Sequence, residues 1–233
     1  MRYKNVVKAR FISRPNRFIA NVNVDGETVV SHIKNTGRCR ELLVPDAAVY
    51  LEDFDGRMGT RKLRYSLIAV EKQGLLINMD SQAPNKVAEE ALKSGAIGFE
   101  ELGPLSIVKP ETVYGDSRFD FYVESEGGKK GFIEVKGCTL EDNGICSFPD
   151  APTERGVKHV NELVKAKEEG YFAAILFIVQ MQGMKYFVPN DETHKVFGDA
   201  LRKAAASGVR VRAFECRVTP DTLDADREIE VRL

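Results

Sequence analysis

Two carboxylates and a lysine, on two neighbouring predicted strands, are the residues of this chain best suited to chemistry. Asp120 stands between two phenylalanines, and Glu134-Val135-Lys136 lies on the next predicted strand. Side chains two apart on a strand share a face, so Glu134 and Lys136 point the same way. If the hairpin between the strands turns about Gly127, Asp120 faces Glu134 directly. The two carboxylates then meet on one sheet face, with the lysine beside them.

Two adjacent carboxylates repel each other unless a proton or a cation lies between them. A hard divalent cation, Mg²⁺ or Mn²⁺, suits such a pair, because it binds few carboxylates and completes its shell with water and phosphate oxygens. The cation would polarise a phosphodiester and activate a bound water, and Lys136 would orient that water or stabilise transition-state charge. The pattern predicts a metal-dependent nuclease site in which Asp120, Glu134 and Lys136 are catalytic. The alternative is a surface hairpin whose Glu134 and Lys136 form an ordinary ion pair.

Helices and strands alternate around this hairpin. Residues 83–179 are predicted to run α–β–β–β–α–β, which is the order of the PD-(D/E)xK nuclease core. The leading helix carries Glu89 and Glu90, and either would extend the metal site. The predicted elements of this half are Ala83–Ser94 (helix, stopped by Gly95), Leu105–Lys109, Arg118–Val123, Gly131–Lys136, Glu154–Glu169 (helix), Phe172–Val179, Lys185–Val188, Glu192–Ala206 (helix) and Val209–Val218.

The helix that follows the hairpin carries two more polar residues of interest. Thr153 is a suitable N-cap for it. Arg155 and His159 are four apart and share one helix face. Close to a helix N-terminus they would hold a phosphate. The alternative is an ordinary polar face turned to solvent.

The first 80 residues are predicted to form a small β-domain. Phe18–Val24 alternates apolar and polar residues, Asp25-Gly26 makes a turn, and Glu27–Ile33 returns, which indicates a hairpin. Further short apolar runs cover Ala47–Leu51, Leu63–Val70 and Leu75–Met79. Five or six short strands suggest a closed or partly closed OB-like barrel. Another small β-domain is the alternative, because strand count does not fix topology.

Charge separates the two halves of the 233-residue chain. Residues 1–80 contain 14 Lys and Arg and 9 Asp and Glu, a net charge of +5. Because the whole chain has a net charge of −1, residues 81–233 have a net charge of −6. A basic face on a small domain suits a polyanion, and a solvated charged surface is the alternative. The basic clusters are Arg2, Lys4, Lys8, Arg10, Arg14 and Arg17, and then Arg57, Arg61, Lys62 and Arg64.

Composition excludes several classes of protein. The chain is 43% hydrophobic and 30% charged, which is ordinary for a folded globular protein. The longest apolar run, about Phe172–Val179, is far shorter than the roughly 20 residues of a membrane helix. The basic N-terminal segment has no apolar signal-peptide core, so we expect a cytoplasmic protein without a membrane partner. Four cysteines and three histidines form no zinc pattern.

The chain resembles the sugar fermentation stimulation protein A family of bacteria and archaea, essentially end to end. It differs from the common pattern at Lys34, where a proline is frequent, and at Gly137-Cys138, where Ser-Val is frequent. The stretches that carry the resemblance are His32 with Asn35-Thr36-Gly37, Asn85 with Glu90-Ala91, Tyr114-Gly115, Ser117–Phe121, Ile133–Lys136 with Thr139-Leu140, Phe148–Ala151, Thr153–Gly156 and Lys158-His159.

The resemblance implies an α/β protein (α+β overall) of two domains. Residues 1–80 would be a nucleic-acid-binding OB-like β-barrel, and residues 81–233 a restriction-endonuclease-like PD-(D/E)xK domain. It also implies DNA binding and a role as a regulator of sugar (maltose) utilisation genes. The nuclease-like positions of the family fall on Glu90, Asp120, Glu134 and Lys136, with Glu90, Asp120 and Glu134 as metal ligands.

Three functions remain open at this stage. The first is a DNA-binding, metal-dependent nuclease, the second a DNA-binding regulator without catalysis, and the third an RNA-binding OB module with an appended scaffold. Cleavage, salt-dependent binding without cleavage, and preference for RNA would distinguish them. A homodimer is the default oligomer. The residues predicted to contact nucleic acid are Arg10, Arg14, Arg17, Arg38, Arg155 and His159.

Overall fold

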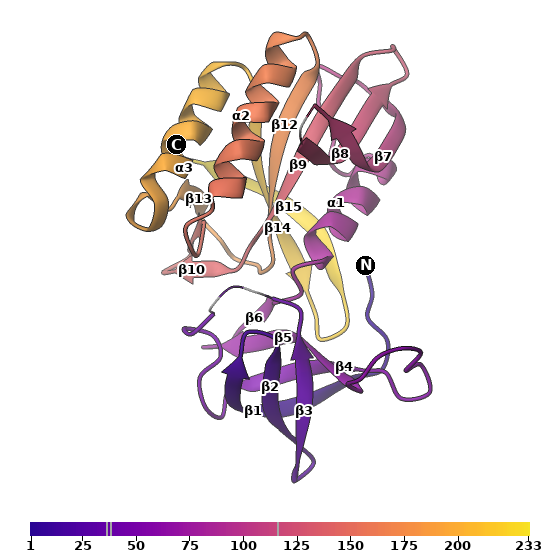
Figure 1. Ribbon diagram of the computed structural model, residues 1–233, viewed down its shortest axis with the longest axis vertical. Coiled ribbons are helices and arrows are strands. Elements are labelled where there is room, and N and C mark those ends of the chain that lie inside the picture. The colour runs from indigo at the N-terminus through magenta and orange to yellow at the C-terminus, as the bar shows by residue number, and fades with distance from the viewer. Residues whose placement is uncertain (36, 38, 116) are drawn as a thin grey trace.

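The computed structural model of the protein describes residues 1–35, 37, 39–115 and 117–233. It contains two β-sheets, one in each half of the chain (Figure 1). None of the helices in this described part of the chain is long and apolar enough to span a membrane.

The first sheet forms the predicted OB-like barrel. Its strand order is β3-β2-β1-β4-β5-β6, and a parallel pairing of β3 with β5 closes the barrel on itself. β6 lies outside the closure, as an added strand on β5. The strands are β1 (Val6–Asn16), β2 (Ile19–Val24), β3 (Glu27–Ile33), β4 (Ala48–Asp53), β5 (Tyr65–Lys72) and β6 (Leu75–Asn78).

The first strand of the barrel was not predicted, and the hairpin after it was. In β1, Ala9 and Phe11 are buried while Arg10 and Ile12 are exposed, so the strand alternates but its outer face is basic. In the sequence these outward-facing basic residues look like a charge cluster, which hides the alternation of a strand. The β2–β3 turn at Asp25-Gly26 has positive φ at both residues, which is the geometry of a tight two-residue hairpin turn.

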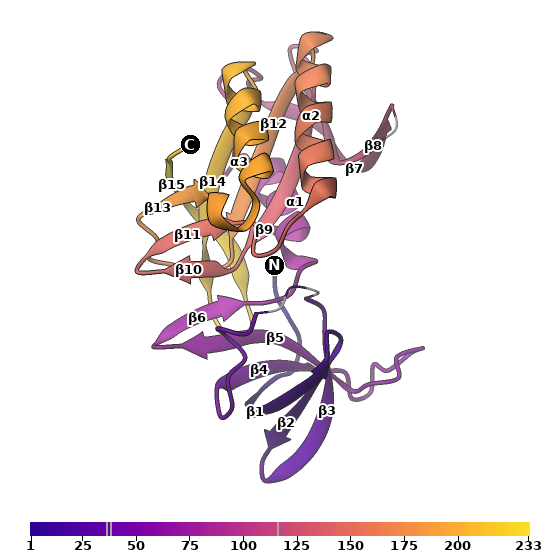
Figure 2. The same ribbon diagram turned by 60° about the vertical axis from the view of Figure 1, so that its left-hand side comes forward.

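The second sheet is mixed and is covered by helices on both faces. Its order is β10-β11-β13-β15-β14-β12-β9-β8-β7. α2 and α3 lie side by side on one face, and α1 covers the other (Figures 1 and 2). The elements are α1 (Ala83–Ser94), β7 (Leu105–Tyr114), β8 (Ser117–Ser125), β9 (Lys130–Cys138), β10 (Leu140–Asp142), β11 (Ile145–Phe148), α2 (Glu154–Glu168), β12 (Phe172–Val179), β13 (Tyr186–Pro189), α3 (Asp191–Ala206), β14 (Arg210–Val218) and β15 (Leu223–Val231).

The central strand β12 shows why the helices pack on both sides. All eight of its residues are buried. Ile175 and Phe177 join the apolar cluster beneath α2 and α3, whereas Leu176 and Ile178 join the cluster beneath α1. A strand buried on both faces is uniformly apolar, which is the pattern its sequence shows.

The predicted order of elements around the hairpin is confirmed, with two additions. A short hairpin, β10–β11, is inserted between β9 and α2, and a last strand, β15, follows β14. In β15 only Leu223 and Ile229 are buried. Its remaining side chains are polar or partly exposed, so no apolar alternation marked it as a strand.

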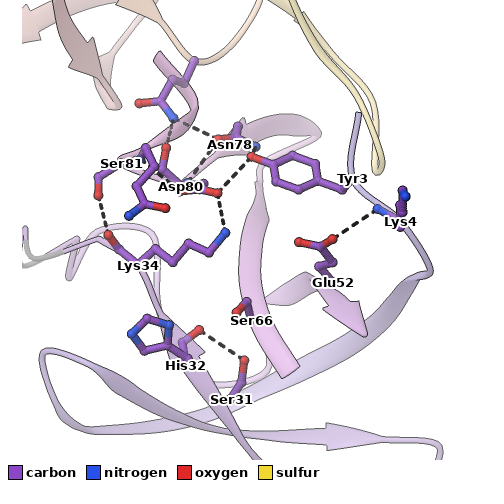
Figure 3. Close-up of polar contacts among 12 residues, drawn as sticks. Tyr3, Lys4, Ser31, His32, Lys34, Glu52, Ser66, Asn78, Asp80 and Ser81 are labelled. Atoms are coloured by element: carbon purple, nitrogen blue, oxygen red, sulfur yellow. Dashed lines mark hydrogen bonds and ion pairs between the residues drawn. The ribbon is translucent and has the colours of Figure 1, made fainter. Parts of the chain in front are cut away.

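A buried polar network joins the barrel to the second unit (Figure 3). Asp80 accepts hydrogen bonds from Lys34 Nζ at 2.9 Å and from Tyr3 Oη at 3.4 Å. Gln180 Nε2, from the end of β12, donates to Asn78 Oδ1 at 2.9 Å and to the Asp80 carbonyl at 3.1 Å. Burial and the nearby Asp80 charge raise the pKa of Tyr3, which keeps its hydroxyl protonated. The network fixes the loop after β3 against the end of the second sheet.

Candidate functional site

The β8–β9 hairpin has the predicted register about Gly127. Its paired residues are Phe121↔Ile133, Tyr122↔Phe132 and Val123↔Gly131. The ladder pairs end at Phe121, one residue short of Asp120.

Beyond the last paired residues, the Asp120 carboxylate accepts a hydrogen bond from the backbone of β9 in place of a backbone carbonyl of β8. Its Oδ2 atom accepts the backbone N–H of Val135 at 2.7 Å. Phe119 and Phe121, which would share a face on a regular strand, join apolar clusters on opposite sides of the sheet. The strand therefore changes orientation at Asp120.

Asp120 is held from a second side by α1. Asn85, in the first turn of that helix, donates from Nδ2 to Asp120 Oδ1 at 2.8 Å. Burial and the negative charge of Glu134 raise the pKa of Asp120, against the opposing effects of the Val135 N–H, Lys136 and Asn85. The charge of Glu134 thus disfavours ionisation of Asp120, as expected for the two neighbouring carboxylates that the sequence predicts.

Glu134 is the most deeply buried acid of the site, at 1% exposure. Its Oε1 atom is bonded to Lys136 Nζ at 2.5 Å and to His159 Nδ1. Burial opposes ionisation of Glu134, but the hydrogen bond with His159 and the charge of Lys136 outweigh it and lower the pKa. Glu134 is therefore a carboxylate at neutral pH.

The second oxygen of Glu134 is the exceptional atom. Oε2 is buried and has no hydrogen-bond partner among the residues described here. A buried anionic oxygen without a donor is costly, and a cation is the partner that removes the cost. The residues that converge here, Asp120, Glu134, Lys136, Arg155 and His159, are named the carboxylate cluster below.

Arg155 and His159 lie behind Glu134. Thr153 caps α2 as predicted, with its side chain accepting from the Gly156 N–H. Arg155 Nε donates to His159 Nε2 at 3.3 Å. Since arginine only donates, Nε2 is the acceptor and Nδ1 carries the proton that bonds to Glu134. Both ring nitrogens of His159 are hydrogen-bonded within the protein, Nε2 to Arg155 and Nδ1 to Glu134, and its contact with a phosphate stays a prediction.

Glu90, predicted as a metal ligand, lies away from the carboxylate cluster in this structure. Its carboxylate pairs with the Met1 amino group at 2.8 Å and is 62% exposed. Glu90 is five residues beyond Asn85, which turns its side chain well away from the helix face that meets Asp120. Glu89 pairs with Lys93 at 2.6 Å. Asn85 is the residue of α1 that reaches the cluster. Its position after Pro84, at the start of the helix, did not indicate this contact.

Few carboxylates are available for a metal. Across the described ranges, no group of three or more His, Cys, Asp and Glu side chains is arranged to hold an ion. A site here would rest on Asp120 and Glu134, with water and phosphate oxygens as further ligands. Such a ligand set is that of Mg²⁺ rather than of a metal held in an all-protein cage.

The arginines predicted to bind nucleic acid separate into two groups. Arg10 donates to the Asp46 carbonyl at 3.0 Å. Arg14 and Arg17 instead line a cavity of about 530 Å³ together with Arg40, which was not among the predicted contacts. Arg38 lies outside the described residues. The remaining lining residues of this arginine cavity are Asn16, Gly37, Leu43 and Ala151.

A smaller cavity of about 160 Å³ adjoins the first. Both are lined by Gly37, whose Cα faces the side chains of Asp150 and Asn35 too closely for a Cβ to fit. The smaller cavity is also lined by Gly137 and Thr139, which follow Lys136 along the chain. At Gly137 a Cβ would lie 2.6 Å from Gln180 Oε1 and from Pro84 Cγ, so the close packing there requires glycine.

Comparison with known proteins covers the whole chain. Residues 12–79 match the SfsA N-terminal OB domain, and residues 82–222 match the sugar fermentation stimulation protein RE domain. A sugar fermentation stimulation protein homolog of Desulfitobacterium hafniense strain Y51 is 51% identical over 233 residues, covering 100% of this chain and 99% of the relative. A homolog of Clostridium beijerinckii is 50% identical, covering 100% of both.

A solved structure is also similar throughout. It is described as the structure of Pyrococcus furiosus SfsA in complex with Ca²⁺. The two chains are 27% identical, with a TM-score of 0.88, and the match covers 100% of this chain and 98% of the other.

Proposed function

Because the chain belongs to the sugar fermentation stimulation protein family, with an OB barrel and a nuclease-like second domain, we propose that it binds DNA and cleaves its phosphodiester bonds with a divalent metal. One observation carries the proposal. Glu134 is buried, ionised and held through Oε1, and it presents an unpartnered Oε2 next to a second carboxylate, that of Asp120.

The donor set fits a hard divalent cation. Asp120 and Glu134 would hold Mg²⁺ or Mn²⁺, and the cation would remove both the repulsion between them and the cost of the orphaned oxygen. The Ca²⁺ complex of the Pyrococcus relative supports a divalent ion in this fold. When bound, the metal would polarise a phosphodiester and lower the pKa of a water.

The protein's own groups then supply position and charge. Lys136 is bonded to Glu134 and its side chain remains 17% exposed, which leaves it open to a phosphate that meets the cluster. There it would stabilise the negative charge that develops as the phosphodiester is attacked. His159 holds Glu134 Oε1, and Asn85 and the Val135 N–H hold Asp120. Both carboxylates are therefore oriented before a substrate arrives.

The test is cleavage of end-labelled single- and double-stranded DNA in EDTA, Mg²⁺ or Mn²⁺. Cleavage by the parent protein in metal, reduced at least about 100-fold in Glu134→Gln, is the expected result. Lys136→Ala should lower turnover more than metal affinity, which calorimetric titration of Mg²⁺ measures separately. Glu126→Gln is the matched control, because Glu126 is exposed in the turn of the same hairpin. Unchanged cleavage in Glu134→Gln would remove the cluster from the mechanism.

A second candidate is a DNA-binding regulator of sugar (maltose) metabolism genes that does not cut. The small number of acids favours it, since within the described ranges only two carboxylates meet at the cluster and Glu90 does not join them. The acidic balance of residues 81–233 also works against close approach of DNA to this domain. Retardation of DNA without cleavage in any metal would establish this function instead.

A further inference from the structure

The arginine cavity lies between the two units of the molecule. Arg14 and Arg17 come from the end of β1 and the turn after it, and Arg40 comes from the loop between β3 and β4. Ala151 contributes from the second unit, in the segment between β11 and α2. The barrel thus supplies six of the seven lining residues, and none of the described lining residues is acidic.

Two of its cations differ from the ion-paired cations of the barrel. Elsewhere on the barrel Lys8 pairs with Glu71, Arg57 with Glu52 and Arg64 with Asp53. By contrast, no described carboxylate forms an ion pair with Arg17 or Arg40. Arg14 is anchored by the carbonyls of Arg17 and Asn35, each at 2.9 Å, which holds its guanidinium at the cavity wall. Concentrated positive charge of this kind suits an anionic ligand.

An exposed aromatic ring stands beside these cations. Phe18 was predicted to share a strand face with Ala20 and Val22, which are buried, but it precedes β2 and is 50% exposed. The Asn16 side chain accepts the Phe18 N–H at 2.9 Å and fixes the turn. The Arg17 guanidinium lies 5.7 Å from the centre of the Phe18 ring. A cationic hollow next to an exposed ring is the combination that binds single-stranded nucleic acid, in which phosphates contact cations and bases stack.

The dimensions favour one strand over two. A volume of about 530 Å³ is that of a small-ligand pocket, which suits one or two nucleotides but not the stacked base pairs of a duplex. The adjoining cavity leads from Gly37 toward Gly137 and Thr139, next to Lys136. Its lining includes Asp150, whose negative charge disfavours a phosphate there relative to the first cavity.

We infer that the arginine cavity is a single-stranded DNA subsite. Arg17 and Arg40 bind backbone phosphates, Phe18 stacks a base, and the strand continues past Gly37 toward the carboxylate cluster. The inference rests on the proposed function only in taking DNA as the polymer. It needs neither metal nor cleavage, so the two proposals fail separately.

The first test is binding of a short fluorescent oligothymidylate in EDTA, followed by anisotropy over a range of salt concentrations. Arg17→Ala/Arg40→Ala is compared with Lys129→Ala/Lys130→Ala, which removes the same charge from the exposed hairpin end far from the barrel. We expect the first variant alone to weaken binding at least tenfold and to reduce the slope of log affinity against log salt by about 1.4, or about 0.7 for each lost phosphate contact.

The second test concerns the ring and the strand preference. Phe18→Ala should weaken oligothymidylate binding about tenfold without changing the salt slope, and Phe18→Tyr should retain binding, since stacking needs only an aromatic face. A hairpin duplex of equal phosphate number should bind the parent protein more weakly than the single strand. Equal or tighter duplex binding, or equal losses in the Arg17/Arg40 and Lys129/Lys130 variants, would overturn the inference.

Discussion

The carboxylate cluster and the arginine cavity handle charge in opposite ways. In the cluster, Glu134 Oε1 has two internal partners and both Asp120 oxygens are hydrogen-bonded, so among its described carboxylate oxygens Glu134 Oε2 is the one without a hydrogen bond. In the cavity, Arg17 and Arg40 face open space. The side chains of the cluster are held in place before a ligand binds, whereas in the cavity an anionic ligand would itself hold Arg17 and Arg40 in place.

This contrast matches the work each region would do. Chemistry at a phosphodiester needs groups held within a fraction of an ångström, which burial and hydrogen bonds supply. Holding a polymer along its length needs only charge and a stacking surface, which tolerate movement. The buried network around Asp80 joins the two domains that carry these regions, because it ties the loop after β3 to the residue that follows β12.

The largest effect that sharpens the comparison should come from His159, the internal partner of Glu134. His159→Ala frees one side of the carboxylate and should lower Mg²⁺ affinity about 10- to 100-fold. His159→Asn keeps a donor near the Nδ1 position and should recover most of that affinity. Calorimetric titration well below the melting temperature measures both. If His159→Ala lowers only the melting temperature, the histidine is structural and the cluster is less organised than described.

A smaller effect follows from the repulsion between the two acids. The pKa of Asp120 is raised by burial and by Glu134, so the fold disfavours its ionised form. That destabilisation is present above the folded pKa and disappears as the pH falls below it. Asp120→Asn should therefore raise the melting temperature by a few degrees at neutral pH in EDTA, while losing the stabilisation that Mg²⁺ gives the parent.

The same measurement carried to acid pH separates the two carboxylates. The gap between Asp120→Asn and the parent should close as the pH falls through the folded pKa of Asp120. Glu134 acts in the other direction, because its pKa is lowered: its stabilisation is present above its ordinary pKa and is lost as the pH falls through the folded value. A melting temperature of Asp120→Asn below that of the parent at every pH would show that the two acids do not oppose each other.

What the sequence predicted differs between the two regions for a physical reason. The turn about Gly127 fixes the β8–β9 register locally, so the approach of Asp120 to the strand of Glu134 follows from residues close together in the chain. The arginine cavity depends instead on residues far apart in the chain. The β3–β5 pairing that closes the barrel and the position of Ala151 cannot be predicted from the residues around Phe18 or Arg40.

Helix phase explains the other differences between prediction and structure. The spacing of Arg155 and His159 correctly put them on one face of α2, but could not show that this face meets Glu134. Glu90 does not reach the cluster in this structure, because the packing of α1 on the sheet presents Asn85 to Asp120. The sequence indicates which side chains could take part in the chemistry, whereas the orientation of each helix depends on packing between distant parts of the chain.

The smallest expected effect concerns Arg10, which the sequence grouped with Arg14 and Arg17. Arg10 already donates to the Asp46 carbonyl and lies 4.0 Å from its carboxylate, so part of its charge is compensated on the barrel wall. Arg10→Ala should change oligothymidylate affinity by no more than about twofold, in line with one exposed and partly paired cation. Anisotropy in EDTA at low salt is the most sensitive measurement. A loss as large as that of an Arg17→Ala variant would extend the DNA surface along the outer face of β1, and the cavity would then be one end of a longer groove.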